Sequence, residues 1–244
     1  MPTTALLANL YHDLLPFPVR STAWHIRHHS FSCGLQKLRS EGAGILGLFD
    51  QHRCVFVHVP KSAGTSVAHG LFGKEFESAK LGHAKLRAYE VLLGRDAFAT
   101  YFKFAFVRNP WDRVVSAYEF LKQGGTGTYD VEWTAAHIGK YPDFRTFVQQ
   151  WITPRNIYRN AVFVPQWEFV MVRGKVAVDF LGHYESLHSD FSRITRQLGL
   201  TSSLEHRNRS MSRKDYRNYY DAATRHIIDK VYRKDIEVFD YVFD

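Results

Sequence analysis

The stretch FVHVPKSAGTSV, residues 56–67, decides the fold expected for this chain. The apolar residues 54–59 are rich in β-branched side chains, which predicts a buried strand that ends at Pro60. A helix should follow, and the small residues 62–66 at its start leave several backbone N–H groups open to one anion, while Lys61 adds a positive charge. The segment is therefore predicted to bind a phosphate-like group. The alternative is an ordinary strand-to-helix turn with a solvated Lys61.

This segment differs from the nucleoside-triphosphate loop G-x-x-x-x-G-K-[ST]. Lys61 precedes Gly64, and the stretch before the Lys carries no Gly. A triphosphate loop works with a magnesium ion held by its Ser/Thr and a distant Asp. The shorter loop here has the size for a single phosphate-like group and one Lys.

A second stretch, YFKFAFVRNPWDRVVSAYEF at residues 101–120, has the same order of strand and helix. Its first half is aromatic and β-branched, and Asn109 followed by Pro110 is typical of a helix start. Arg108 should end its strand at the same edge of the sheet as the first loop, and Ser116 should lie two turns into the helix. Both side chains can then point at a second anion.

Together the two segments resemble those of the sulfotransferases that use 3′-phosphoadenosine 5′-phosphosulfate (PAPS). The closest likeness is to the carbohydrate branch, the family 2-like enzymes related to the heparan and chondroitin sulfotransferases. The resemblance implies that the first loop binds the 5′-phosphosulfate and that Arg108 and Ser116 bind the 3′-phosphate. It extends through residues 178–200 and 206–220, so that it covers about residues 54–244. The first fifty residues show no such likeness.

The resemblance also implies a set of cofactor-binding residues at both loops and in the basic segment HRNRS that begins at His206. That segment could instead be a solvated basic loop. The cofactor-binding residues are Pro60, Lys61, Ser62, Ala63, Gly64, Thr65, Ser66, Arg108, Ser116, Arg209 and Ser210.

His83 is the candidate general base. Sulfuryl transfer needs a group that takes the proton of the acceptor hydroxyl, and imidazole has a pKa near the operating pH. A His after a Gly in this interval is similar in position and role to that of the related enzymes, although a capping or surface His is the alternative. Glu168 is a second candidate base, and His58 and His69 are weaker candidates. Gln166, in a segment similar to one near the acceptor in the family, and Glu168 are the candidate substrate contacts.

Periodicity predicts further elements. A third strand is expected over residues 176–181, and Phe144, Phe147, Val148 and Trp151 recur at helical spacing that indicates core packing. Residues 123–140 are expected to form a mobile, irregular loop. The apolar spacing of residues 223–232 predicts a closing amphipathic helix that docks on the sheet.

These elements, with the resemblance, predict an α/β fold. We expect a single P-loop-like domain with a mostly parallel central sheet flanked by helices, because chains of 244 residues commonly form one domain in this class. Residues 51–244 should form the sulfotransferase domain. Residues 1–50 should form an N-terminal extension that is packed on the domain or leads into it.

The net charge of +8 and the sequence pI of about 9.4 suit an acidic partner. A phosphorylated and sulfated cofactor accounts for part of this charge, and the acceptor could be a polyanionic saccharide. The sequence carries no zinc-ligand spacing, helix-turn-helix or RNA-binding motif, so nucleic acid is not expected as a partner.

Cysteine content and hydropathy bear on the compartment. The two cysteines, Cys33 and Cys54, do not form a disulfide scaffold, which favours a reducing environment. No apolar run has the length of a membrane span, and the start of the chain lacks a signal-peptide pattern. We expect a bacterial cytoplasmic enzyme, or a Golgi-lumen enzyme whose anchor lies outside this sequence. No metal site is expected, since no Cys or carboxylate completes a set around His25, His28 and His29.

The expected reaction moves a sulfuryl group from PAPS to a carbohydrate hydroxyl by in-line displacement without a metal. Lys61 would neutralise the charge on the leaving oxygen, and His83 would accept the proton. One alternative is a P-loop kinase that acts on ATP with magnesium, and a second is a non-catalytic protein that binds polyanions.

Overall fold

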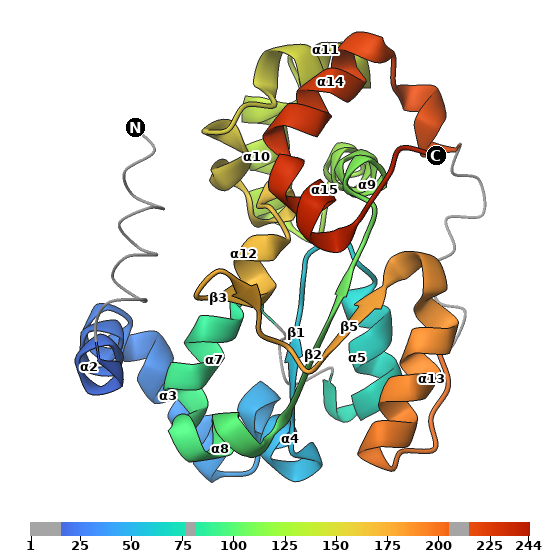
Figure 1. The fold of residues 1–244 in the computed structure, drawn as a ribbon. Coiled ribbons are helices and arrows are strands. Elements are labelled where there is room, and N and C mark those ends of the chain that lie inside the picture. The colour runs from blue at the N-terminus through green and yellow to red at the C-terminus, as the bar shows by residue number, and fades with distance from the viewer. Residues whose placement is uncertain (1–15, 77–81, 205–214) are drawn as a thin grey trace. The chain divides into compact units, whose positions relative to one another are not determined.

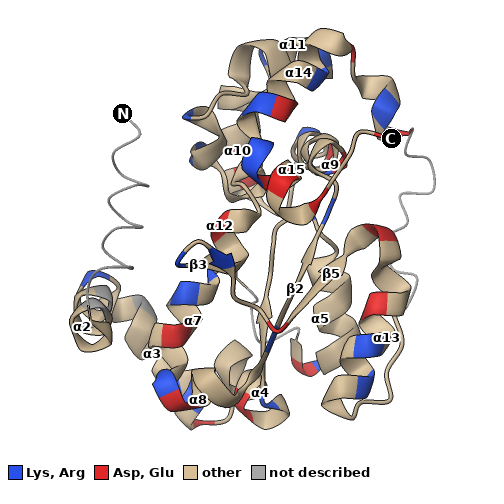
Figure 2. Cartoon of the chain, viewed as in Figure 1, with Lys and Arg blue, Asp and Glu red and all other residues tan. Residues whose placement is uncertain are grey.

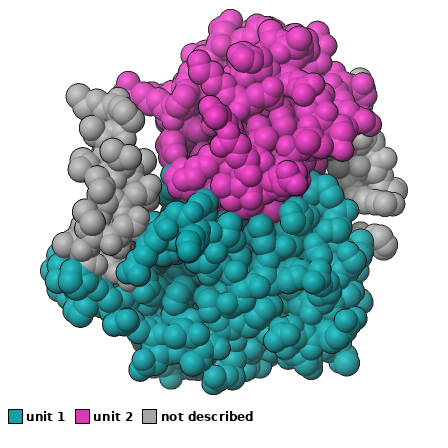
Figure 3. All heavy atoms as spheres, viewed as in Figure 1, with its two compact units in different colours: residues 1–59, 63–106, 168–207 teal, residues 60–62, 107–167, 208–244 magenta. Residues whose placement is uncertain are grey.

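The computed structural model describes residues 16–76, 82–204 and 215–244. The chain forms two compact units, which Figure 3 shows in different colours. Unit 1 comprises residues 1–59, 63–106 and 168–207, and unit 2 comprises residues 60–62, 107–167 and 208–244. Within the described residues, none of the helices has the length and apolar character that crossing a membrane requires.

Unit 1 is built on a parallel three-stranded sheet, as the sequence predicts. Its strands are β1 (Cys54–Val57), β2 (Phe102–Val107) and β5 (Phe180–His183), in the order β1-β2-β5. Cys54 pairs with Phe102 and Val57 with Ala105. All four residues of β1 are buried, which explains why this strand reads as a continuous apolar run.

Helices flank this sheet (Figure 1). Phe49 of α4 packs on Tyr89 of α7 with ring centroids 5.4 Å apart, and α5 and α13 approach closely where Gly70 meets Phe191. Figure 1 shows α7 and α8 on one side of the sheet and α5 and α13 on the other. The helices of this unit are α2 (Phe17–Arg27), α3 (His29–Ser40), α4 (Gly44–His52), α5 (Gly64–Phe72), α7 (Leu86–Leu93), α8 (Arg95–Thr100) and α13 (Leu187–Leu198), with the 3₁₀ turn η3 (Tyr184–Ser186).

Unit 2 is helical. Aromatic side chains form its core: Trp151 lies 5.0 Å from Phe163 and 5.2 Å from Phe147 between ring centroids. Its helices are α9 (Pro110–Lys122), α10 (Thr128–His137), α11 (Phe144–Trp151), α14 (Ala222–Val231) and α15 (Arg233–Phe239), with the 3₁₀ turns η1 (Asn156–Arg159), η2 (Ala161–Phe163) and η4 (Tyr216–Tyr219). The short helix α12 (Trp167–Val170) begins in this unit and continues into unit 1.

Local sequence explains the start of α9. The Asn109 side chain accepts hydrogen bonds from the backbone N–H groups of Trp111 and Asp112, at 3.1 Å and 3.3 Å. Pro110 occupies the first turn, where a missing N–H costs nothing. The predicted helix cap is therefore confirmed, and so is the predicted packing of α11, whose four expected apolar residues are all buried.

Three expectations were wrong. The third strand of the sheet is β5 rather than residues 176–181, because β4 (Lys175–Val176) folds back on β3 (Met171–Val172) as an antiparallel hairpin. Residues 123–140 contain α10 instead of an irregular loop, since Trp133 anchors this helix 5.5 Å from the Trp151 ring. The closing helix α14 packs on α9 and α11 rather than on the sheet.

Candidate functional site

The loop after β1 turns through two residues in the left-handed backbone region. Lys61 has φ of 66° and Ala63 has φ of 64°, and α5 begins at Gly64. Residues other than Gly and Asn seldom adopt this conformation, which costs about 1–2 kcal/mol per residue. No side chain at Ala63 caps the helix, so the first N–H groups of α5 have no side-chain acceptor there. Such a curled loop before a helix start is a typical anion-binding backbone.

In unit 2, the Arg108 side chain lies against this loop. Its Nη1 donates to the carbonyl oxygen of Lys61 at 3.1 Å, and its Nε donates to Asp112 Oδ2 at 2.6 Å. The Lys61 ammonium lies 3.8 Å from the centroid of the Phe120 ring. Two of the predicted anion-binding cations, Lys61 and Arg108, are therefore neighbours within one unit. Ser116 is half-buried on α9, one turn beyond Asp112.

Gln166 links the two predicted anion loops. Its Oε1 accepts from the Arg108 N–H at 2.9 Å and from the Ser62 hydroxyl at 3.3 Å, and its Nε2 donates to the Arg108 carbonyl at 2.8 Å. The side chain is fully buried. Its polar atoms are thus engaged by the loops themselves.

A buried carboxylate in turn holds the backbone of this residue. Asp235 on α15 accepts from the N–H groups of Gln166 and Trp167, at 2.9 Å and 2.8 Å. Burial raises the pKa of Asp235, against the opposing influence of the Arg113 charge and of the two N–H groups. Arg113 is itself fully buried and donates to two backbone carbonyls, at 3.0 Å and 2.9 Å, while burial lowers its pKa.

In unit 1, two histidines lie together at the start of α5. The rings of His58 and His83 have centroids 4.6 Å apart, with His58 buried and His83 exposed. A Cβ atom on Gly64 would lie 1.8 Å from Cδ2 of His58. The first residue of α5 must therefore be Gly because the His58 imidazole occupies that space.

Glu168, the second candidate base, is engaged by a lysine. Lys85 Nζ lies 2.6 Å from Glu168 Oε2, and the Glu168 side chain is only 5% exposed. The Lys85 ammonium donates to this carboxylate, so one of the two Glu168 oxygens is already engaged within unit 1. His69, the remaining candidate, is half-buried on α5 and packs edge-on to Phe76.

The other predicted site residues are distributed as follows. Pro60 and Ser62 are buried in unit 2, whereas Thr65 is exposed and Ser66 half-buried on α5 in unit 1. Arg209 and Ser210 lie outside the described residues. Across residues 16–76, 82–204 and 215–244, no three His, Cys, Asp or Glu residues are grouped so that they could hold a metal ion.

Sequence reasoning missed three residues that shape these sites: Lys85, Phe120 and Asp235. Lys85 follows His83 by two positions, a local signal that could have marked it. Phe120 lies in the quoted second stretch, yet its contact with Lys61 depends on the fold. Asp235 is indistinguishable in sequence from a solvated helix-start carboxylate, although it is fully buried.

The chain is similar to known proteins over most of its length. A family model described as "Sulfotransferase family" matches residues 47–242. An uncharacterized protein of Archaeoglobus fulgidus is 32% identical over 125 residues, which are 51% of this chain and 90% of that protein. No solved structure matches this chain.

Proposed function

The chain belongs to the sulfotransferase family, and from this membership we propose that it transfers a sulfuryl group from PAPS to a hydroxyl of a carbohydrate. The observation that carries the proposal is the contact between the Arg108 guanidinium and the Lys61 backbone in unit 2. A ligand with phosphate groups at both ends of an adenosine needs two anion sites, and this contact joins the two segments that the proposal assigns to them.

The residues present fit such a ligand. The loop turns through Lys61 and Ala63 in the left-handed region, and no side chain caps the start of α5, so the first N–H groups of the helix can bind an anion. Arg108 is 5% exposed, and a guanidinium held in a buried position binds phosphate strongly through paired N–H groups.

PAPS supplies an activated sulfuryl group, whose bond to the 5′-phosphate oxygen breaks as a bond to the acceptor oxygen forms. In the proposed scheme, the Lys61 ammonium neutralises the charge that grows on the released phosphate oxygen. The N–H groups of residues 62–66 bind the 5′-phosphate, and the 3′-phosphate is bound by Arg108, Ser116, Arg209 and Ser210. No metal takes part in this scheme.

His83 is proposed to take the proton of the acceptor hydroxyl. Its exposed imidazole is accessible to an acceptor, whereas His58 is packed between Phe56 and Gly64. Glu168 is proposed to contact the acceptor. Gln166 is proposed to influence acceptor binding indirectly, because its side-chain amide holds the loops of Ser62 and Arg108 in place. The proposed acceptor is a carbohydrate, and polyanionic saccharides belong to this class. The proposed sulfotransferase domain spans residues 51–244.

Calorimetry with 3′-phosphoadenosine 5′-phosphate tests the proposal. We expect micromolar binding that disappears in Arg108→Ala and persists in Arg155→Ala, which removes an exposed arginine of the same unit. Tight binding of ATP with magnesium, in place of the bisphosphate, would support a kinase and overturn the proposal. A radiolabelled-sulfate screen over glycan acceptors then identifies the acceptor.

A further inference from the structure

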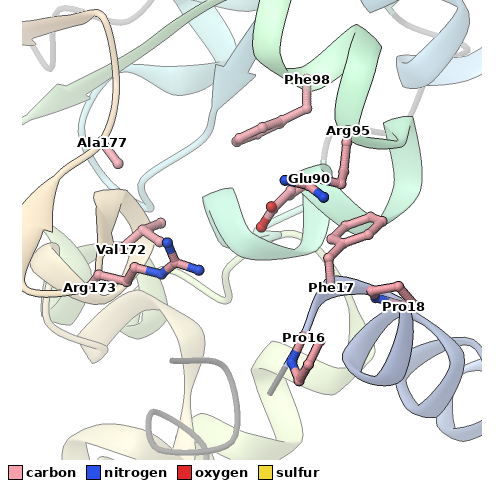
Figure 4. A pocket seen from close by; sticks show the side chains of 9 residues that line it. All are labelled: Pro16, Phe17, Pro18, Glu90, Arg95, Phe98, Val172, Arg173 and Ala177. Atoms are coloured by element: carbon pink, nitrogen blue, oxygen red, sulfur yellow. The ribbon is translucent and has the colours of Figure 1, made fainter. Parts of the chain in front are cut away.

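Unit 1 contains a cavity of about 390 Å³ that none of the proposed catalytic or cofactor-binding residues lines. It lies among the start of α2, the helices α7 and α8, and the β3–β4 hairpin (Figure 4). Its volume falls in the range of small-molecule sites. Five of its lining residues carry the argument that follows: Phe17, Glu90, Arg95, Phe98 and Arg173.

Two arginines give the cavity its positive charge. Figure 4 shows Arg95 and Arg173 extending from opposite walls toward the space between them. Arg95 lies 5.6 Å from the centroid of the Phe17 ring, and neither guanidinium makes an ion pair with another residue in the described ranges. Figure 2 shows the basic residues of α8 and of the hairpin in blue. The charges of Arg95, Arg173 and Glu90 add up to a net charge of +1 on the cavity lining, which favours an anion.

Arg173 is held at the cavity by a turn that favours other residues. It forms the two-residue loop of the hairpin with Gly174, and the φ angles are 52° and 76°. Positive φ at both positions is typical of a type I′ turn, in which Asn-Gly is the preferred pair. A long side chain at the first position gains nothing from the turn itself, so its placement is better explained by the cavity.

The remaining lining residues define what the arginines would bind. Phe17 and Phe98 provide aromatic surfaces for the flat face of a ring, and Glu90 can accept a hydrogen bond from a ring substituent. Guanidinium groups match the paired oxygens of carboxylate and sulfate. We propose that this cavity binds a carboxylate or sulfate group carried on a six-membered ring. An acidic sugar and an aromatic acid share this chemistry.

Saturation-transfer NMR on the full chain tests the proposal with methyl β-glucuronide and with benzoate. Each acid is compared with its neutral counterpart, methyl β-glucoside or benzamide. We expect at least one acid to bind more tightly than its neutral counterpart. The acid that binds more tightly shows whether the natural ligand is an acidic sugar or an aromatic acid. The double variant Arg95→Gln/Arg173→Asn should weaken that binding at least tenfold, since Asn suits the turn while removing the charge.

Lys175→Gln is the matched control, because it removes an exposed charge from the same hairpin without lining the cavity. It should bind the acid as the unaltered chain does, and Phe98→Leu should bind it more weakly. Equal affinity for the neutral counterparts, or unchanged affinity in the double variant, would overturn the proposal. So would equal displacement by inorganic sulfate, which has no ring. Affinity for the adenosine bisphosphate should stay constant in all of these cavity variants. A failure of the cavity proposal can therefore be distinguished from a failure of the proposed sulfotransferase function.

Discussion

The side-chain amide of Gln166 pairs with both backbone groups of Arg108, accepting from its N–H at 2.9 Å and donating to its carbonyl at 2.8 Å. This is the pattern that a neighbouring strand would provide. Because Oε1 also accepts from the Ser62 hydroxyl, one buried side chain determines the backbone position of both loops in unit 2. The direction of the Arg108 guanidinium thus depends on a residue that is remote in sequence.

Gln166→Met should therefore weaken both stability and nucleotide binding. The substitution keeps the approximate volume but leaves the Arg108 backbone groups without partners, at a cost of about 1–3 kcal/mol in the free energy of unfolding. Affinity for the adenosine bisphosphate should fall about tenfold, a loss of about 1.4 kcal/mol. Urea unfolding and calorimetry measure the two effects. Gln149→Met, at an exposed position of α11, should change neither, and equal results for the two variants would contradict the coupling.

Lys61→Ala should reduce turnover about a hundredfold or more, the scale of one lost charge partner in the transition state. Nucleotide affinity should fall much less than turnover, because the loop backbone remains. A single-turnover sulfate-transfer assay separates the two quantities. Lys122→Ala provides the comparison, since Lys122 also lies over an aromatic ring, Tyr118 at 5.5 Å, in the same unit. A loss of similar size in both variants would exclude a specific role for Lys61.

Gly64→Ala should disturb the start of α5. The added methyl group would meet the His58 ring at 1.8 Å, which forces the imidazole to move and costs about 1–3 kcal/mol of stability. Thermal unfolding and nucleotide titration should both register the change. Gly82→Ala is the control, because a Cβ there meets nothing within 4 Å. If Gly64→Ala behaves as the control does, the packing described for His58 is wrong.

His83→Ala should lower turnover by about 10²–10⁴-fold and leave nucleotide affinity nearly intact, as expected for the loss of a general base. His137→Ala, at a half-buried position on α10, is the histidine control. An active His83→Ala enzyme would remove this residue from the mechanism and direct attention to Glu168.

The acid stability of unit 1 should depend on Asp50. Burial raises the pKa of this carboxyl, but hydrogen bonds from Arg39 at 2.6 Å and Tyr101 at 2.8 Å outweigh it, so the folded pKa is lowered. The interaction therefore stabilises the fold above the unfolded pKa of about 3.9 and is lost as the pH falls through the folded value. Asp50→Asn should cost about 1–2 kcal/mol at pH 6 and less at pH 3, as measured by urea unfolding. An equal cost at both pH values would contradict this.

Local signals explain the parts of the fold that the sequence predicts. The buried runs of β1 and β2, the Asn109–Pro110 helix start and the spacing of apolar residues in α11 each depend on neighbours along the chain. The hairpin of β3 and β4 escaped prediction because its turn is Arg173–Gly174 rather than a typical Asn-Gly pair. The third strand of the sheet consequently begins at Phe180 instead of at residue 176.

The site residues also divide into those that local sequence predicts and those that only the fold reveals. Motifs placed Lys61 and Arg108 at the ends of two strands, and the structure brings them together within unit 2. The bond between Arg108 and Gln166 spans 58 positions, and the bond between Lys85 and Glu168 spans 83. Polar partners so far apart in sequence are visible only once the chain is folded, because no periodicity or cap marks them.

The left-handed backbone conformation of Arg173 predicts which residues selection would retain at this position. If heat tolerance alone were selected in a library at this position, Asn or Gly should replace Arg, since either would relax the turn. Selection for capture of a ring-borne acid should retain it. The residue recovered under each regime would reveal whether stability was traded for recognition at the tip of the hairpin.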